Sequence, residues 1–188
     1  MSRHEDGAFA SFARLVRVLT FEVMTTDDTD WRLHGVRIVH ADELDRDTTQ
    51  TPGMARAAAI TNARAGAERL WAGTVVIEPG ARTGAHHHGR VESVIYVIAG
   101  RARMRWGARL GYTAEAGPGD FIYVPPYLPH QEINAGDNTP LFCVVVRGDQ
   151  EAVVVNLDLP DVEPHPEEVR WIDDIHTPAH PTTQPHDR

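Results

Sequence analysis

Hydrophobic residues follow their most regular pattern between Leu70 and Leu159. Short runs rich in Val, Ile, Phe and Trp recur there, and Gly, Pro, Asn or Asp bounds each run. Such runs are typical of β-strands separated by turns. The expected strands are 71–78, 86–88, 93–98, 101–106, 121–124, 130–134, 141–147 and 153–157. No convincing helical pattern lies among them, so the region predicts an all-β antiparallel sandwich or barrel.

The sequence on either side of this region is less regular. Residues 36–40 have the composition of a short strand, and residues 55–59 fit either a strand or a helical turn. Proline is frequent after position 159, which predicts an extended, flexible tail. We therefore divide the chain into an N-terminal appendage at 1–23, an arm with short strands at 24–70, a β-barrel at 71–159 and a flexible, Pro- and His-rich tail at 160–188. An upstream start codon would explain the appendage.

Composition narrows the classes of partner and chemistry. The chain has 27 acidic and 18 basic residues, a net charge of −9, and no basic run, so neither nucleic acid nor a membrane is an expected partner. Every basic residue is Arg, and without Lys there is no lysine Schiff-base chemistry. The single cysteine, Cys143, lies in an apolar run and permits no intramolecular disulfide. With a single cysteine, we expect a protein of the reducing cytoplasm. No apolar run has the length of a membrane helix.

Four potential metal ligands stand out in the predicted barrel. His86 and His88 are two residues apart, so on a strand their side chains point to the same face. Glu92 follows shortly after a Gly-Arg pair, and His130 follows a proline about forty residues later. Three imidazoles and one carboxylate suit a divalent transition metal such as iron, manganese, nickel, copper or zinc.

Two motifs around these residues resemble those of the cupin superfamily. The first motif is a Gly, five residues, His-x-His, three or four residues, Glu and, about six residues later, a Gly. It is matched by Gly80, His86, His88 and Glu92, with Gly100 closing it one position late. The second motif is a Gly, five residues, Pro-x-Gly, two residues, His, three residues and Asn. It is matched by Gly119, Pro125, His130 and Asn134, with Tyr127 in place of the inner Gly.

The resemblance covers residues 71–146 and implies a jelly-roll β-barrel, also called a double-stranded β-helix. It further implies that His86, His88, Glu92 and His130 bind one metal ion inside the barrel, and that the protein is a homodimer. Four protein ligands around a metal with octahedral preference leave up to two positions for water, dioxygen or substrate. An open position of this kind distinguishes a catalytic from a structural metal site.

Alternation along the strands extends the candidate site. If Glu92 points into the barrel, Tyr96 shares its face, and if His130 points inward, so does Glu132. Glu132 is then a candidate general base, and Tyr96 a candidate proton-handling or orienting residue. The alternatives are a solvent-exposed Glu132 at the barrel rim and a Tyr96 in the core. Asn134 is a candidate hydrogen-bond partner for a ligating histidine, with a role in a turn as its alternative.

Two functions of different class fit this reading. The first is a metal-dependent enzyme that acts on a small organic molecule, with a dioxygenase as the leading form and a metal-assisted isomerase or decarboxylase as the alternative. The second is a non-catalytic binder or sensor of a small ligand, in which the metal is structural or anchors that ligand. Because one fold of this kind supports many unrelated reactions, the sequence selects neither the substrate nor the metal.

Overall fold

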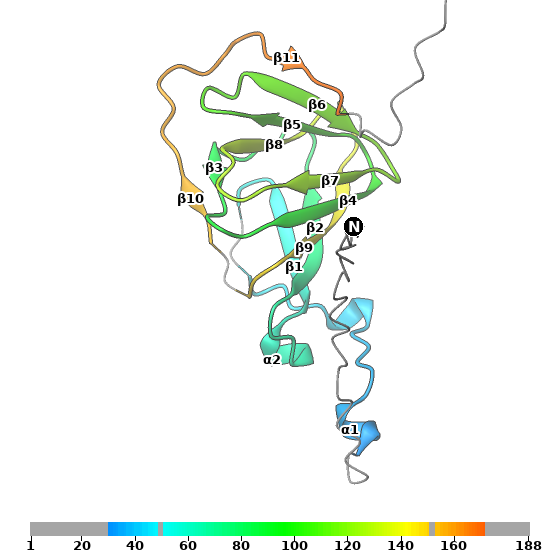
Figure 1. Cartoon of the computed structure of the whole chain (residues 1–188). Helices are drawn as coiled ribbons and strands as arrows, with labels where there is room; N and C mark the ends of the chain where they lie inside the picture. The colour runs from blue at the N-terminus through cyan, green and yellow to red at the C-terminus, as the bar shows by residue number, and fades with distance from the viewer. Residues whose placement is uncertain (1–29, 49–50, 151–152, 172–188) are drawn as a thin grey trace, which may run out of the picture. The chain divides into compact units, whose positions relative to one another are not determined.

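The computed structural model describes residues 30–48, 51–150 and 153–171 (Figure 1). It divides into two units, residues 1–36 and residues 37–188. The described part of the first unit contains the short helix α1 (Trp31–His34), where the carboxylate of Asp30 accepts a hydrogen bond from the backbone N–H of Arg32 at 3.0 Å. The predicted appendage at 1–23 and the tail beyond 171 lie outside the described residues.

The second unit is built almost entirely of strands. Its described residues also include a 3₁₀ helix at Ala41–Glu43 and the helix α2 (Asn62–Ala65). The strands are β1 (Met54–Ile60), β2 (Trp71–Ile77), β3 (His86–His87), β4 (Ser93–Ala99), β5 (Ala102–Trp106), β6 (Tyr112–Ala116), β7 (Phe121–Val124), β8 (His130–Asn134), β9 (Leu141–Arg147), β10 (Val155–Asn156) and β11 (Glu167–Glu168).

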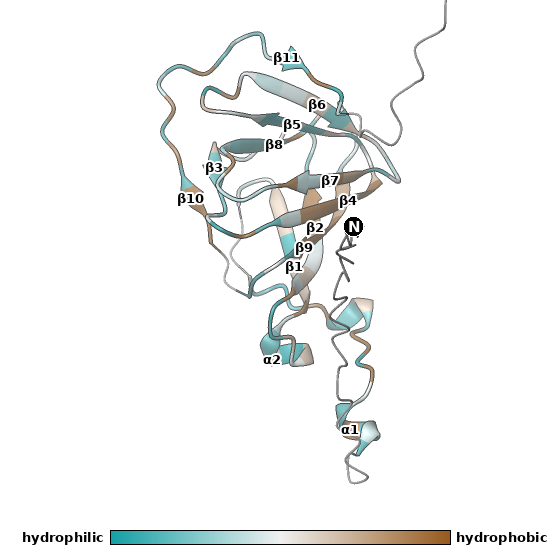
Figure 2. Ribbon diagram, viewed as in Figure 1, coloured by the Kyte–Doolittle hydropathy of each residue, from teal (hydrophilic) through white to brown (hydrophobic). Residues whose placement is uncertain are grey.

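These strands form two sheets that face each other in a jelly-roll barrel (Figure 1). One sheet has five strands in the order β1-β2-β9-β4-β7, and the other has six in the order β10-β3-β8-β5-β6-β11. Every pairing is antiparallel except the parallel pair of β11 and β6. The predicted all-β class and jelly-roll fold are therefore confirmed. Figure 2 shows apolar residues gathered on β2, β4 and β9, with polar residues more frequent on β5, β6 and β8.

The structure decides two uncertain segments of the arm. Residues 55–59 lie in β1, which pairs with β2 along its length, so the strand alternative is correct. The strand expected at 36–40 is absent, and the side chains of Val36 and Ile38 are 95% and 73% exposed. A strand this short has little stability without a neighbour to pair with.

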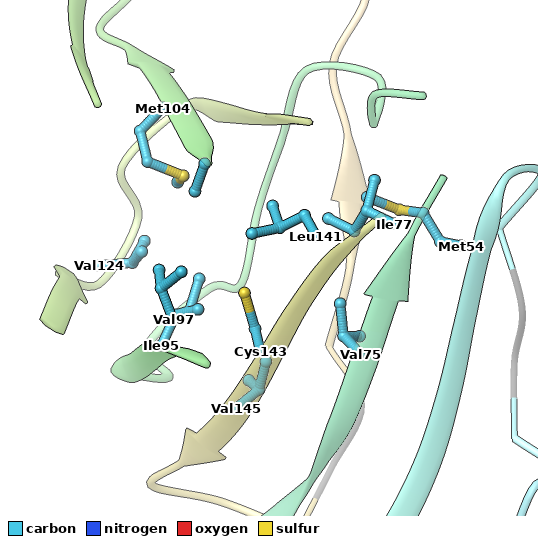
Figure 3. Close-up of a cluster of buried hydrophobic side chains, with 11 residues drawn as sticks. Met54, Val75, Ile77, Ile95, Val97, Met104, Val124, Leu141, Cys143 and Val145 are labelled. Carbon is cyan, nitrogen blue, oxygen red and sulfur yellow. The ribbon is translucent and has the colours of Figure 1, made fainter. Parts of the chain in front are cut away.

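The hydrophobic core lies between the two sheets (Figure 3). It is formed by Met54, Val75, Ile77, Ile95, Val97, Ala102, Met104, Val124, Leu141, Cys143 and Val145. Cys143 is 2% exposed, as expected for a small core residue, and burial raises the pKa of its thiol to about 12. Complete burial of one Val or Leu side chain is worth about 1.5–3 kcal/mol, so this cluster supplies much of the barrel's stability.

The turn between β4 and β5 requires a glycine at position 100. Gly100 has a φ of 88°, and a Cβ atom there would lie 2.7 Å from the carbonyl oxygen of Pro140 and 2.8 Å from the Cα of Leu141. Neither the conformation nor the space suits a larger residue. The residues that β4 turns toward the interior are Ser93, Ile95 and Val97, each less than 7% exposed.

Residues 160–171, the described part of the predicted tail, run beside β6. Backbone N–H groups of Glu163, Glu167 and Val169 donate hydrogen bonds to the carbonyl oxygens of Arg109, Gly111 and Thr113 at 2.8–2.9 Å. The segment adds the short strand β11 to the six-stranded sheet. Among the described residues, no helix is long and apolar enough to span a membrane.

Candidate metal centre

Three histidines converge inside the barrel. His86 on β3 is the cross-strand partner of His130 on β8, and His88 follows β3 on the same face as His86. Their ring centroids lie 4.4–5.1 Å apart. His86 and His88 are 5% exposed and His130 is 1% exposed. The structure therefore brings together all three histidines that the sequence predicted as ligands.

A backbone carbonyl fixes each imidazole in one tautomer. The Nδ1 atoms of His86, His88 and His130 lie 3.0, 2.8 and 2.8 Å from the carbonyl oxygens of Gly84, Val153 and Leu128. A carbonyl oxygen only accepts hydrogen bonds, so each Nδ1 carries the proton and donates it. Each Nε2 then presents a lone pair, as in the histidine ligands of metal sites.

The surroundings favour the neutral form of His88 and His130. Burial lowers the pKa of His88 to about 4, against the smaller raising effect of the bond to Val153. Burial also lowers the pKa of His130, and the nearby charge of Arg147 acts in the same direction. The Nε2 atom of His130 is buried and has no hydrogen-bond partner among the described residues. A buried lone pair without a donor is costly, and a metal ion at this point would satisfy it.

Glu132 completes the cluster. It lies two residues after His130 on β8, and its carboxylate and the three imidazoles offer ligand atoms that all lie within 4.8 Å of one another. Two atoms bound to one transition metal at about 2.1 Å are at most about 4.2 Å apart, so small side-chain movements would bring this set to bonding distance. No hydrogen bond to the Glu132 carboxylate is found in the described part of the chain, which leaves its oxygens available. The inward position predicted for Glu132 agrees with this cluster.

Glu92 does not lie with the histidines, which corrects the predicted ligand set. Its side chain is exposed, and its Oε1 accepts a hydrogen bond from the hydroxyl of Tyr123 at 2.6 Å. This bond raises the pKa of Tyr123. Glu92 precedes β4, and the interior position at the start of that strand is occupied by Ser93.

Tyr96 does not lie at the site either, because the face of β4 that carries Ser93 is the one that points into the barrel. It lies on the outer face of β4, where its ring packs 4.8 Å from that of Phe121. Every residue from 94 to 98 is apolar or aromatic, so composition does not distinguish the two faces of β4. The prediction used Glu92 to choose the face, and the structure shows the opposite face turned inward.

Asn134 supports a turn rather than a histidine. Its amide group donates hydrogen bonds to the carbonyl oxygens of Ile77 and Thr139 at 2.9 and 2.8 Å, and its Oδ1 accepts one from the N–H of Gly136 at 2.8 Å. This 3% exposed side chain links the β8–β9 connection to β2. The alternative role in a turn is therefore the one observed.

Two features of the centre were not predicted. The partners of the three Nδ1 atoms are backbone carbonyls, which carry no sequence signal because every residue has one. The inward position of Ser93 did have a signal: counting back from Gly100 by the usual spacing places Ser93, not Glu92, at the carboxylate position of the first motif. The late closing glycine marked this shift.

Besides a cavity of about 860 Å³ whose lining includes His130, two small cavities adjoin the cluster. One, of about 20 Å³, is lined by core side chains of both sheets together with Glu132. The other, of about 10 Å³, is lined by His88, Glu132, Ser93 and Arg147 among others. Volumes of this size admit one or two molecules as small as water. The centre thus has an apolar side and a charged side.

Comparison with known families and structures agrees with this architecture. Residues 73–147 match the family model of the cupin domain. The polyketide cyclase RemF from Streptomyces resistomycificus is 25% identical with a TM-score of 0.56, over 66% of this chain and 87% of that one. A comparison with curated protein sequences found no match.

Other similar structures cover different shares of their chains. A mutant form of Bacillus subtilis oxalate decarboxylase is 27% identical with a TM-score of 0.51, over 59% of this chain but 30% of that one. Another structure of that enzyme, 26% identical with a TM-score of 0.50 over 60% of this chain and 30% of that one, is described as having Mn(II) centres. KdgF from Halomonas sp. is 19% identical with a TM-score of 0.51, over 62% of this chain and 96% of that one, and shows the shared fold.

Proposed function

We propose that this chain, whose residues 73–147 form a cupin domain, is a metal-dependent enzyme that acts on a small organic molecule. The observation that carries the proposal is the convergence of three tautomer-fixed Nε2 atoms and the Glu132 carboxylate on one buried point. We assign His86, His88, His130 and Glu132 as the metal ligands. A divalent iron, manganese, nickel, copper or zinc ion suits this donor set.

Four protein donors support a catalytic rather than a purely structural centre. Within the described residues, the cluster contains four donor side chains. A metal with octahedral preference keeps two further positions, which is the condition for binding a substrate or a second reactant. A non-catalytic binder with a closed metal site would instead need its remaining positions filled by the protein.

Dioxygen-dependent oxidation is the reaction class that the cavity favours. Apart from Glu132, the 20 Å³ cavity is lined by apolar side chains and by Cys143, whose raised pKa keeps it a thiol at neutral pH. With Glu132 assigned to the metal, this lining supplies no separate proton carrier, and an apolar space suits dioxygen. A bound redox-active metal would supply the electron transfer that dioxygen requires. Met104 and Ile122 would exclude water from this side of the centre.

A non-oxidative reaction is the second candidate, and the comparisons favour it. Two of the similar proteins, with 25% and 27% identity, are named as a polyketide cyclase and an oxalate decarboxylase. A metal that polarises a substrate oxygen can accelerate cyclisation, isomerisation and decarboxylation. The same four ligands would serve this chemistry.

Oxygen uptake separates the two reaction classes. Full-length protein would be analysed for metals by inductively coupled plasma mass spectrometry, and tested with enols, catechols and keto acids in an oxygen electrode. Near-stoichiometric iron, manganese, nickel or copper with oxygen consumption supports the dioxygenase. Substrate conversion without oxygen uptake supports the non-oxidative reaction. Absence of stoichiometric metal after reconstitution would contradict both.

We also propose a homodimer that buries the outer face of the five-stranded sheet. Large side chains exposed on that face are Val94, Ile98, Phe121, Tyr123 and Phe142, with exposed fractions of 37–72%. Apolar patches of this kind commonly form subunit interfaces. Sedimentation velocity of the wild type and of Phe121→Ser tests this: we expect a dimer that the substitution weakens, and a monomeric wild type would contradict it. A cytoplasmic location stays a prediction from cysteine content.

A further inference from the structure

Arg147 points into the barrel beside the metal centre. It ends β9, which lies between β2 and β4 (Figure 1), and its cross-strand partners are Trp71 on β2 and Ser93 on β4. Directly paired residues on neighbouring strands project to the same face of a sheet. Ser93 is 3% exposed and faces the interior, so Arg147 faces the interior as well. Both residues line the 10 Å³ cavity with His88 and Glu132.

Two polar groups of this cavity lack a partner. The Oγ of Ser93 and the Nε of Arg147 are buried and make no hydrogen bond within the described residues. The guanidinium of Arg147 is held in place by the ring of Trp71, whose centroid lies 5.5 Å from its Cζ. An arginine held in position with a buried, unsatisfied donor is prepared to bind an acceptor that the protein does not supply.

The balance of charge indicates an anionic acceptor. Arg56 also lines this cavity. Burial lowers the pKa of Arg147, the charge of Glu132 raises it, and the charge of Arg56 lowers it. The lining of the cavity thus carries two guanidinium groups and one carboxylate. A divalent metal bound to Glu132 would add further positive charge. A partly buried cluster of positive charges is destabilising, and a bound anion would relieve this.

We propose that Arg147 and Ser93 form a subsite for a carboxylate of the substrate, next to the metal centre. The site is built for a planar anion, because a guanidinium pairs with the two oxygens of a carboxylate through parallel N–H donors. The hydroxyl of Ser93 supplies a further donor on the same wall of the cavity. Arg147 is thus a specificity-determining residue of the site assigned above, and this inference rests on that assignment.

Binding of a matched pair of small molecules tests the subsite. Propionate and propionamide have nearly the same shape, but only propionate is charged. Their dissociation constants would be measured by isothermal titration calorimetry on metal-loaded full-length protein, for the wild type and Arg147→Met. The matched control is Arg103→Met, which removes an arginine that pairs with Glu115 on the outer face of β5. Metal content would be measured for every sample.

We expect propionate to bind the wild type and Arg103→Met alike, and to bind Arg147→Met at least about tenfold more weakly at unchanged metal content. Propionamide should bind the wild type at least about tenfold more weakly than propionate does. Equal affinity of Arg147→Met for propionate, or equal affinity of the wild type for both probes, would overturn the subsite. If Arg147→Met does not fold, Arg147→Lys replaces it, and wild-type affinity in that variant counts against the paired guanidinium contact.

The metal assignment and the subsite fail in different ways. A wild type that binds metal stoichiometrically but binds no propionate would refute the subsite and leave the metal centre standing. A wild type without stoichiometric metal that still binds propionate through Arg147 would refute the proposed function and support the subsite.

Discussion

His130 and Glu132 lie two residues apart on β8, and their side chains reach the same buried cluster. One strand therefore supplies both an imidazole and the carboxylate of the assigned centre. Glu92, the carboxylate that the first motif suggested, lies outside the barrel and binds Tyr123. The position of the carboxylate determines which substitution should weaken metal binding.

Replacing Glu132 should weaken metal binding, whereas replacing Glu92 should not. Loss of a residue that merely orients a ligand costs roughly 10- to 100-fold in metal affinity, so Glu132→Gln should cost at least as much. Glu92→Gln removes only the charge of an exposed side chain whose oxygen accepts a hydrogen bond from Tyr123. Competition with a chromophoric chelator measures both variants. His130→Ala serves as the positive control, and retained wild-type affinity in Glu132→Gln would refute the assigned ligand set.

A carboxylate at position 93 should partly restore what Glu132→Gln loses. Ser93 stands at the motif position of the carboxylate, counted back from Gly100, and its side chain faces the cavity that His88 and Glu132 line. The double variant Ser93→Glu with Glu132→Gln should therefore bind metal more tightly than Glu132→Gln alone. The same chelator competition measures this, and Ser93→Gln with Glu132→Gln is the uncharged control. Equal weakness of both double variants would show that position 93 does not reach the metal.

The alternation of residues predicted one half of the site well. From His130, period-two alternation placed Glu132 inside, and the short spacing of His86 and His88 placed both imidazoles on one face. The same reasoning on Ala102 and Met104 is consistent with their burial in the core. On β5 the polar Arg103 separates Ala102 from Met104, so the two faces of that strand are chemically distinct.

Alternation failed where both faces of a strand are apolar. Nothing between Val94 and Ile98 distinguishes inside from outside, so the face of β4 depended on Glu92 alone. The turn at Gly100 determines the register physically, through a backbone conformation and a close approach to Pro140 that only tertiary structure shows. The carbonyl partners of the histidines are likewise invisible to sequence, because they depend on where β10 and the loops return.

Without metal, the protein should lose stability as the pH falls from about 6.5 toward 4. The pKa of His88 is lowered to about 4 in the folded state, whereas an unfolded histidine titrates near 6.5. Between these values the unfolded chain binds more protons than the folded protein, so the free energy of unfolding decreases with decreasing pH. The lowered pKa of His130 acts in the same direction. Urea denaturation at several pH values measures the slope.

His88→Gln is the variant that isolates this effect. Glutamine does not titrate, so the variant should show a shallower pH dependence between 6.5 and 4 than the wild type, whatever its stability at neutral pH. An identical slope in the two metal-free proteins would mean that His88 is not held neutral by the fold.

Tyr127 adopts a conformation that glycine tolerates better. Its φ is 58°, in the left-handed region, at the position where the second motif has a Gly. Its backbone N–H donates a hydrogen bond to the carbonyl of Gly89 at 2.7 Å, and its side chain is 64% exposed. The turn therefore depends on backbone geometry and gains little from burial of the ring.

Comparison of Tyr127→Gly with Tyr127→Ala removes the ring in both variants and changes only the backbone preference. A left-handed residue other than glycine costs about 1–2 kcal/mol, while the greater freedom of glycine in the unfolded chain costs roughly 0.5–1 kcal/mol. Tyr127→Gly should thus exceed Tyr127→Ala in free energy of unfolding by about 0.5–1 kcal/mol. Urea denaturation of the metal-free proteins measures the difference. A more stable alanine variant would show that the turn at 127 does not hold the left-handed conformation, because alanine would then carry no strain.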